Sequence, residues 1–274
     1  MKNTKIGFIG GGNMARSLIG GLLASGVNKA ALSVADPTAA QRDELAKDFG
    51  ISTTADNQHI VDQCEVIVLA VKPQVMKDVV ARLDIHKARE KLFVSIAAGV
   101  RSHAIQKWLG EDVPVVRTMP NTPSLVQSGA TGLYATCQVS EAQRDQAESI
   151  LRAVGLTLWV DTEAQLDAVT ALSGSGPAYF YLVMEAMEKA GTQLGLEPET
   201  ARLLTVQTAF GAAKLALEVK DQPADLRRKV TSPGGTTEKA IGVLQANKLE
   251  AIFAEALTAA HDRSIELAAQ LEQD

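Results

Sequence analysis

The chain has 274 residues, of which 46% are hydrophobic and 4% aromatic, and its formal net charge is −5 at pH 7. This length allows one large or two ordinary domains, and the hydrophobic content excludes a disordered or fibrous chain. The negative charge and the scarcity of aromatic side chains argue against nucleic acid as the main partner.

The cysteines and the first residues indicate where the protein works. Cys64 and Cys137 match no metal-binding spacing, and two cysteines in a chain of this length are typical of reduced thiols. The N-terminus enters a strand-like run at once, without the charged and then apolar pattern of a secretory signal. The sequence contains no apolar run of about 18 residues. We therefore predict a cytoplasmic protein with no membrane span and no bound metal.

The N-terminal half opens on a glycine-rich turn between a strand pattern and a helix pattern. An apolar run at residues 5–9 precedes Gly10-x-Gly12-x-x-Ala15, and apolar positions at helical spacing follow it. This order is typical of a dinucleotide-binding turn, in which Gly10 permits the tight bend and Gly12 lets the backbone approach a pyrophosphate. Ala15 in the third position still allows close packing of the helix. The alternative is a glycine-rich turn in an α/β domain that binds no nucleotide.

A second strand pattern at residues 31–35 ends at Asp36. A carboxylate at this place favours NADH, because it bonds the adenine ribose and repels a 2′-phosphate. Thr38 and Arg42, at the start of the next helix pattern, could instead bind a phosphate. These residues leave the choice of nicotinamide cofactor open.

Five further apolar runs of strand type follow, at residues 65–71, 92–96, 113–118, 126–134 and 155–160. The first ends in Val71-Lys72-Pro73 and the second runs into Ala98. Because the carboxyl ends of parallel strands face the ligand crevice, we expect cofactor contacts at both places, although Lys72 equally suits a solvated position. Helix patterns separate most of the strands. Residues 1–161 are therefore predicted to form a Rossmann-type doubly wound sheet of the α/β class.

From residue 162 onward the strand pattern stops, and helix patterns cover residues 165–172, 178–194, 198–219, 223–230, 236–245 and 248–271. The stretch SGSGP at 173–177 interrupts them. The long helices are rich in Ala, Leu and Val on more than one face, so they must be buried on several sides. We predict that residues 162–274 form an all-α domain that pairs with a second copy in a two-fold homodimer. The alternative is a self-contained helical bundle.

The stretch TSPGGTT at residues 231–237 lies between two of these helix patterns. Gly234 and Gly235 free the backbone for a close approach, and the following helix presents unpaired N–H groups and a partial positive charge at its start. The turn therefore suits the carboxylate of a small-molecule substrate. The alternative is an ordinary helix cap rich in serine and threonine.

These residues together resemble the Δ1-pyrroline-5-carboxylate reductase family over essentially the whole chain. The resemblance rests on FIGGGNMA, AVKPQ, SIAAGV, RTMPNTP, SGSGPAYFY and PADLRRKVTSPGGTTEKAIGVLQ, which occur in this order. It implies a Rossmann domain followed by a helical domain that interlocks in a dimer, often with dimers assembled into rings. It also implies the reduction of pyrroline-5-carboxylate to L-proline, the last step of proline biosynthesis, with NADPH or NADH.

The resemblance further implies the residues of the site. Cofactor contacts correspond to Gly10, Gly12, Asn13, Met14, Asn57, Val71, Lys72, Pro73 and Ala98. Substrate contacts correspond to Gly234, Gly235, Thr236 and Thr237, and we expect Thr237 to hydrogen-bond the ring nitrogen as the catalytic residue. Some members carry a glutamate shortly before the proline at 223. Here Lys220 or Asp221 stands in that region, so the role of that glutamate is not carried over.

Two other functions fit parts of the sequence. A β-hydroxyacid dehydrogenase or another imine reductase would share the same plan, but the hydroxyacid enzymes use a lysine where this chain has Tyr179 and Phe180. A nicotinamide-binding sensor without catalysis would not need the TSPGGTT turn. The four histidines lie in patterns typical of solvated positions, so none is expected to act as a general acid.

Overall fold

The computed structural model describes residues 3–84, 86, 89–109 and 113–273. Contacts between residues divide the chain into two compact units. The sheet unit comprises Met1–Ser175 and Ala259–Asp274, and the helical unit comprises Gly176–Thr258. The last helix, α12 (Leu249–Gln273), contributes to both units. The predicted boundary between residues 161 and 162 stays a prediction.

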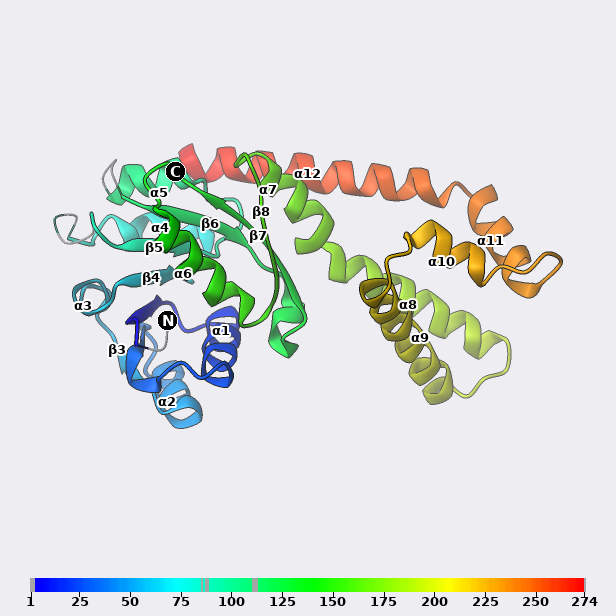
Figure 1. Cartoon of the computed structure of the whole chain (residues 1–274), viewed down its shortest axis with the longest axis horizontal. Helices are drawn as coiled ribbons and strands as arrows, with labels where there is room; N and C mark the ends of the chain where they lie inside the picture. The colour runs from blue at the N-terminus through cyan, green and yellow to red at the C-terminus, as the bar shows by residue number, and fades with distance from the viewer. Residues whose placement is uncertain (1–2, 85, 87–88, 110–112, 274) are drawn as a thin grey trace. The chain divides into compact units, whose positions relative to one another are not determined.

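The sheet unit is built on one eight-stranded sheet with the order β3-β2-β1-β4-β5-β6-β7-β8 (Figure 1). Strands β1 to β6 are parallel, whereas β7 runs antiparallel to β6 and parallel to β8. The strands are β1 (Ile6–Ile9), β2 (Leu32–Ala35), β3 (Ser52–Thr54), β4 (Val66–Leu69), β5 (Leu92–Ser95), β6 (Val115–Met119), β7 (Gly129–Ala135) and β8 (Gly155–Trp159). This topology confirms the predicted Rossmann-type sheet.

Helices cover both faces of the sheet, which explains why β1 and β4 are buried along their whole length. Side chains of α1, α2 and α6 pack on one face, and those of α3, α4 and α5 pack on the other. The helices are α1 (Asn13–Ala24), α2 (Ala39–Phe49), α3 (Asn57–Gln63), α4 (Pro73–Val80), α5 (Ser102–Leu109), α6 (Glu141–Arg152) and α7 (Gln165–Val169). The doubly wound arrangement therefore places a hydrophobic core on each side of the sheet.

Several elements differ from the sequence-based expectation. Strand β3 and helices α4 and α5 were not predicted, because each is short and takes its stability from packing on the sheet. The strand expected at 126–134 begins only at Gly129, since Thr122–Val126 forms a 3₁₀ helix. The SGSGP stretch interrupts the helices less than expected: Thr170–Gly174 forms a π-helix, and only a bend at Ser175 precedes α8 (Gly176–Gln193).

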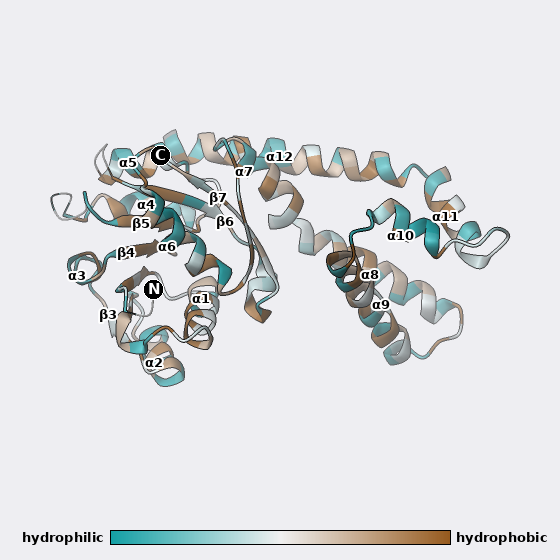
Figure 2. Cartoon of the chain, viewed as in Figure 1, coloured by the Kyte–Doolittle hydropathy of each residue, from teal (hydrophilic) through white to brown (hydrophobic). Residues whose placement is uncertain are grey.

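The helical unit contains α8, α9 (Pro198–Glu218), α10 (Pro223–Lys229), α11 (Thr236–Ala246) and the first part of α12. Apolar residues, brown in Figure 2, run along α8 and α9. Many of them are exposed, among them Phe180, Leu182, Leu203, Leu204 and Phe210. An apolar surface of this extent marks a contact surface for another chain. Within the described residues, no helix is long and apolar enough to cross a membrane.

Candidate functional site

The residues predicted to contact the cofactor gather at the carboxyl edge of the parallel strands. Gly10 follows β1, Val71 follows β4 and Ala98 follows β5, and these three strands are neighbours in the sheet. Asn57 opens α3, which follows β3. Because β1 to β5 run in one direction, their carboxyl ends meet at the same edge. The sheet thus brings together residues that lie far apart in the sequence.

The glycine turn at the start of α1 leaves its outer side open. Gly10 has a φ of 100°, and a Cβ there would lie 2.6 Å from the carbonyl oxygen of Ala70, so only glycine fits. A Cβ at Gly12 would meet no heavy atom within 4 Å. Gly12 also forms the N-cap of α1 without any side-chain cap. The first turn of α1 therefore presents its amides to an open space.

The first helical residues differ in how far they are exposed. Asn13 is exposed and Met14 is half-buried beside the core. Ala15, in the third position of the fingerprint, is buried against the same core. The small alanine therefore serves the close helix packing that the sequence predicted for it.

Asp36 uses its carboxylate within the protein. Its Oδ2 accepts from the amide of Gly11 at 2.9 Å, and its Oδ1 accepts from the amide of Thr38 at 2.9 Å. The guanidinium of Arg42 donates to the carbonyl oxygens of Asp36 and Pro37 at 2.7 and 3.0 Å. Asp36 thereby fixes the glycine turn against the end of β2, whatever further role it has toward a ribose.

Lys72 and Pro73 join β4 to α4, with Lys72 exposed at the N-cap and Pro73 in the first turn. Ala98 is exposed, while its neighbour Gly99 has a φ of 78° and lies under Leu271 of α12. A hollow of about 480 Å³ separates these two loops from α12 within the sheet unit. It is lined by Pro73, Gln74, Ala98, Gly99, Thr170, Ala260, Arg263, Ser264, Leu267, Gln270 and Leu271.

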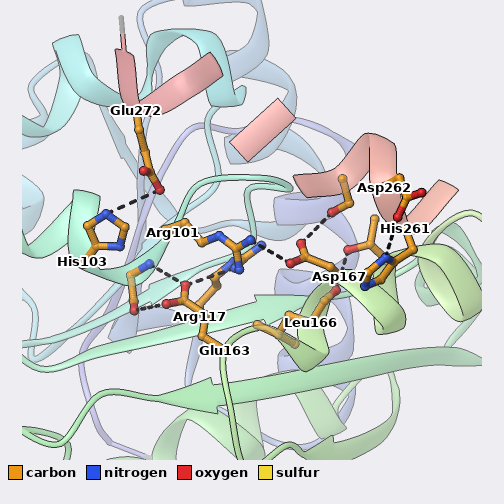
Figure 3. Close-up of polar contacts among 12 residues, drawn as sticks. Arg101, His103, Arg117, Glu163, Leu166, Asp167, His261, Asp262 and Glu272 are labelled. Carbon is orange, nitrogen blue, oxygen red and sulfur yellow. Dashed lines mark hydrogen bonds and ion pairs between the residues drawn. The ribbon is translucent and has the colours of Figure 1, made fainter. Parts of the chain in front are cut away.

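Figure 3 shows a network of charged side chains that includes Arg101, Arg117, Glu163 and Asp167. Arg101 follows the Ala98 loop in the sequence. Glu163 accepts from the amide of Ser102 at 2.6 Å, from its hydroxyl at 2.8 Å and from Arg117 at 3.1 Å. Asp167 accepts from Arg101 at 2.7 Å. Burial lowers the pKa of the Arg117 guanidinium, and Glu163 beside it opposes this shift.

The same network reaches α12. Asp167 also accepts from the hydroxyl of Ser264 at 2.8 Å, and both residues are buried. The C-terminal end of α12 lies beside α5, where His103 and Glu272 pair at 3.4 Å (Figure 1). The end of α12 is therefore held to the sheet unit by polar as well as apolar contacts.

The TSPGGTT turn joins α10 to α11 in the helical unit. Gly234 has a φ of 71°, and its amide donates to Oε2 of Glu238 at 2.8 Å. The amide of Gly235 donates to the carbonyl oxygen of Ser232 at 3.0 Å. Sequence reasoning missed Glu238, although an acidic residue three positions after an N-cap is a known signal.

The start of α11 keeps its own donors available. Gly235 is the N-cap, and no side chain caps this helix. Thr236 is exposed and Thr237 is half-buried. Because the glycine amides already have acceptors, the amides of Thr236 and Thr237 are the donors that the turn offers to an anion.

Three of the four histidines lie at exposed positions, as the sequence predicted, and the fourth is half-buried. His59, His86 and His103 are exposed, and His261 is half-buried beside Asp262 at 3.1 Å. Among the described residues, no group of three or more His, Cys, Asp or Glu side chains could hold a metal ion.

Comparisons with known proteins cover both units. The family model described as pyrroline-5-carboxylate reductase dimerisation matches residues 163–267. The model described as NADP oxidoreductase, coenzyme F420-dependent, matches residues 5–99. The pyrroline-5-carboxylate reductase of Pseudomonas aeruginosa is 55% identical, with 100% of both chains covered. That of Pasteurella multocida is 44% identical over 96% of this chain and 98% of its own.

Solved structures agree with these relatives. A pyrroline-5-carboxylate reductase from Coxiella burnetii superposes with a TM-score of 0.94 at 48% identity, over 97% of this chain and 99% of its own. The pyrroline carboxylate reductase of Plasmodium falciparum, solved with NADP bound, superposes with a TM-score of 0.86 at 28% identity. That match covers 98% of this chain and 99% of the other.

Proposed function

This chain belongs to the pyrroline-5-carboxylate reductase family, and we propose that it performs the reaction that gives the family its name. It is an NAD(P)H-dependent oxidoreductase that reduces the C=N bond of 1-pyrroline-5-carboxylate to give L-proline, the last step of proline biosynthesis. The observation that carries this function is the similarity to reductases along the whole chain, which includes both the glycine turn and the TSPGGTT turn.

NADPH is the cofactor, and the carboxyl edge of the sheet fits it. The open space beside Gly12 accommodates a pyrophosphate, and the uncapped amides of α1 suit its charge. When bound, the nicotinamide supplies the hydride that reduces the imine carbon. The contacts are assigned to Gly10, Gly12, Asn13, Met14, Asn57, Val71, Lys72, Pro73 and Ala98. The related enzyme from Plasmodium falciparum binds NADP, which supports the same cofactor here.

The substrate carboxylate binds at the start of α11. The amides of Thr236 and Thr237 donate to it, and the positive end of the helix dipole adds to the attraction. Gly234 and Gly235 shape the turn through their own hydrogen bonds to Glu238 and Ser232. The glycines therefore contribute to binding by shaping the backbone of the turn, and the threonines contribute by donating hydrogen bonds to the carboxylate.

Thr237 is assigned the catalytic position because its hydroxyl can hydrogen-bond the ring nitrogen. The nitrogen must gain a proton when the imine is reduced to an amine. A cyclic imine is basic enough to arrive protonated or to take its proton from water. The protein then acts mainly by holding the reacting groups in place, which lowers a barrier by roughly 7–11 kcal/mol in favourable cases.

The chain forms a homodimer through its helical region, as the match to the dimerisation family model indicates. The exposed apolar faces of α8 and α9 supply a surface for that contact. Two finer features are proposed: the oligomer is either the dimer itself or a ring of dimers, and the domain boundary lies between residues 161 and 162. The protein is also assigned to the cytoplasm, in keeping with the free thiols of Cys64 and Cys137.

A direct assay tests the function. Purified protein mixed with NADPH and 1-pyrroline-5-carboxylate should lose the absorbance of the reduced cofactor and form L-proline in equal amount. A parallel reaction with a β-hydroxyacid and NADP should show no turnover. NADPH binding without any loss of absorbance would identify a sensor instead and would refute the assignment as an enzyme.

A further inference from the structure

Two carboxylates from the segment around α7 form hydrogen bonds to the end of the loop that carries Ala98. Its tip, Ala98, is exposed at the cofactor edge, while Ala97 and Val100 on either side are anchored in the core. The loop ends at Arg101 and Ser102. Both of these residues bond acidic side chains that lie more than 60 positions further along the chain.

Glu163 makes the closer of the two attachments (Figure 3). It binds the amide of Ser102 at 2.6 Å and its hydroxyl at 2.8 Å, so one carboxylate fixes both backbone and side chain. Arg117 of β6 donates to the same carboxylate at 3.1 Å. The end of the loop is thereby tied to a strand through a charge-assisted bridge.

Asp167 makes the second attachment and joins the loop to α12. It accepts from Arg101 of the loop and from Ser264 of the helix. The same part of α12 covers Gly99, where an added Cβ would lie 3.3 Å from Leu271. The loop is thus fixed at its end by the two carboxylates and at Gly99 by α12, while Ala98 at its tip is exposed.

The burial of this network indicates that it fixes the arrangement of the groups that it joins. Asp167 is 1% exposed, Arg117 is 2% exposed and the Glu163 side chain is 17% exposed. Two acidic and two basic side chains balance in charge, yet buried ion pairs of this kind often stabilise a fold no better than apolar side chains would. Buried pairs do impose a single arrangement on the groups that they join.

From these contacts we propose that Glu163 is a positioning residue for the cofactor, acting through Ser102 on the Ala98 loop. Glu163 holds the loop in its cofactor-binding conformation before NADPH arrives, so that binding does not have to order it. Asp167 supports the same loop by joining its Arg101 to Ser264 of α12. The inference rests on the proposed cofactor contact of Ala98.

The test compares Glu163→Gln with the milder Ser102→Ala. Glu163→Gln keeps the side-chain size but removes the charge that Arg117 needs, and Ser102→Ala removes one of the two bonds to Glu163. We expect the Kd for NADPH, measured by fluorescence without substrate, to rise about tenfold in Glu163→Gln and about threefold in Ser102→Ala. In the cofactor-free protein, hydrogen exchange of peptides covering residues 97–105 should become faster.

Glu148→Gln is the matched control. Glu148 is a carboxylate of similar exposure, 23%, that accepts from Trp159 at 2.8 Å and pairs with Arg152 on α6. Since α6 packs on the opposite face of the sheet from α5, this change should leave NADPH affinity at the wild-type value, even if it lowers the melting temperature. The KM for pyrroline-5-carboxylate at saturating NADPH should be unchanged in Glu163→Gln.

Wild-type NADPH affinity in both Glu163→Gln and Ser102→Ala would overturn the proposal and leave the network a purely structural one. An equal loss of affinity in Glu148→Gln would overturn it as well, because the effect would then follow general stability. If Glu163→Gln does not fold, the Kd for NADPH of Ser102→Ala alone decides whether the proposal holds. Failure of the wild-type protein to reduce pyrroline-5-carboxylate would count against the proposed function alone, since NADPH binding and hydrogen exchange are measured without substrate.

Discussion

Replacing Gly12 with alanine tests whether the open space at the start of α1 is reserved for a pyrophosphate. Gly12 has a φ of −68°, which any residue adopts, and an added Cβ meets no heavy atom within 4 Å. A less flexible unfolded chain stabilises such a variant by about 0.4–1 kcal/mol. Loss of the glycine N-cap costs about 0.5–1 kcal/mol. The two effects cancel, so the free protein should keep its melting temperature.

The cofactor-bound protein should respond differently to the same methyl group. If the pyrophosphate approaches the backbone at Gly12, the added carbon overpacks that contact. Overpacking a close contact costs typically about 1–3 kcal/mol. At 1.4 kcal/mol for each factor of ten, the Kd for NADPH should rise roughly 5- to 150-fold.

Calorimetry for the melting temperature and fluorescence titration for NADPH affinity measure the two effects separately. Gly20→Ala in the middle of α1 is the control, because its Cβ would make an ordinary 3.6 Å contact with Phe49. It should keep NADPH affinity and gain about 0.5–1 kcal/mol of stability. Gly10→Ala should lose stability, since it combines a φ of 100° with a 2.6 Å approach to a carbonyl oxygen. Wild-type NADPH affinity in Gly12→Ala would refute the assignment of this space to the pyrophosphate.

Three further predictions concern other parts of the chain. Thr237→Ala should lower kcat/KM for pyrroline-5-carboxylate by an amount that corresponds to about 1–3 kcal/mol of lost transition-state stabilisation, without changing NADPH affinity. Thr237→Ser should restore kcat/KM. Equal kinetics in Thr237→Ala and wild type would exclude the catalytic assignment. Phe210→Glu, which puts a charge on an exposed apolar face, should weaken the dimer in light scattering, and an unchanged mass at micromolar concentration would show that this face is not buried between protomers. Burial raises the pKa of the Cys64 thiol, so at pH 8 iodoacetamide should alkylate the exposed Cys137 first; preferential alkylation of Cys64 would contradict its burial.

The raised pKa of Cys64 also sets the sign of a pH effect on stability. A thiol that stays protonated to higher pH in the folded state contributes stability that is fully present below its ordinary value of 9.0. That contribution is lost as the pH rises through the folded pKa. Cys64→Ala should therefore flatten the fall in melting temperature above pH 9 relative to the wild-type protein.

Local sequence patterns were sufficient to predict the helix ends and caps that depend on residues close together in the sequence. Helix α2 begins at Ala39, just after Thr38, where the sequence predicted the start of a helix, and Gly50 closes it as a left-handed C-cap with a φ of 65°. Asp56 caps α3 by accepting from the amide of Gln58. The predicted family is also confirmed, because the chain is 55% identical over its whole length to the pyrroline-5-carboxylate reductase of Pseudomonas aeruginosa.

Features that depend on contacts between residues far apart in the sequence were predicted less well. The sequence predicted a strand at 126–134, but it did not predict that β7 and β8 run antiparallel to the first six strands, since strand direction depends on the tertiary path. Short elements such as β3, α4 and α5 were missed because packing on the sheet stabilises them rather than their own propensity. In the TSPGGTT turn, only the structure showed that the Gly234 amide is already bonded to Glu238.

By itself the sequence determined the glycine turn at Gly10 and Gly12, the buried parallel strands, the apolar helices and the TSPGGTT turn, because each is encoded in the spacing of neighbouring residues. Only the tertiary structure decided how Glu163 reaches Ser102, and how Asp167 joins Arg101 to Ser264. These partners lie 61, 66 and 97 positions apart, and no local pattern specifies such pairs. Long-range packing of the sheet, α7 and α12 brings them together, and burial then requires every charge to find a partner.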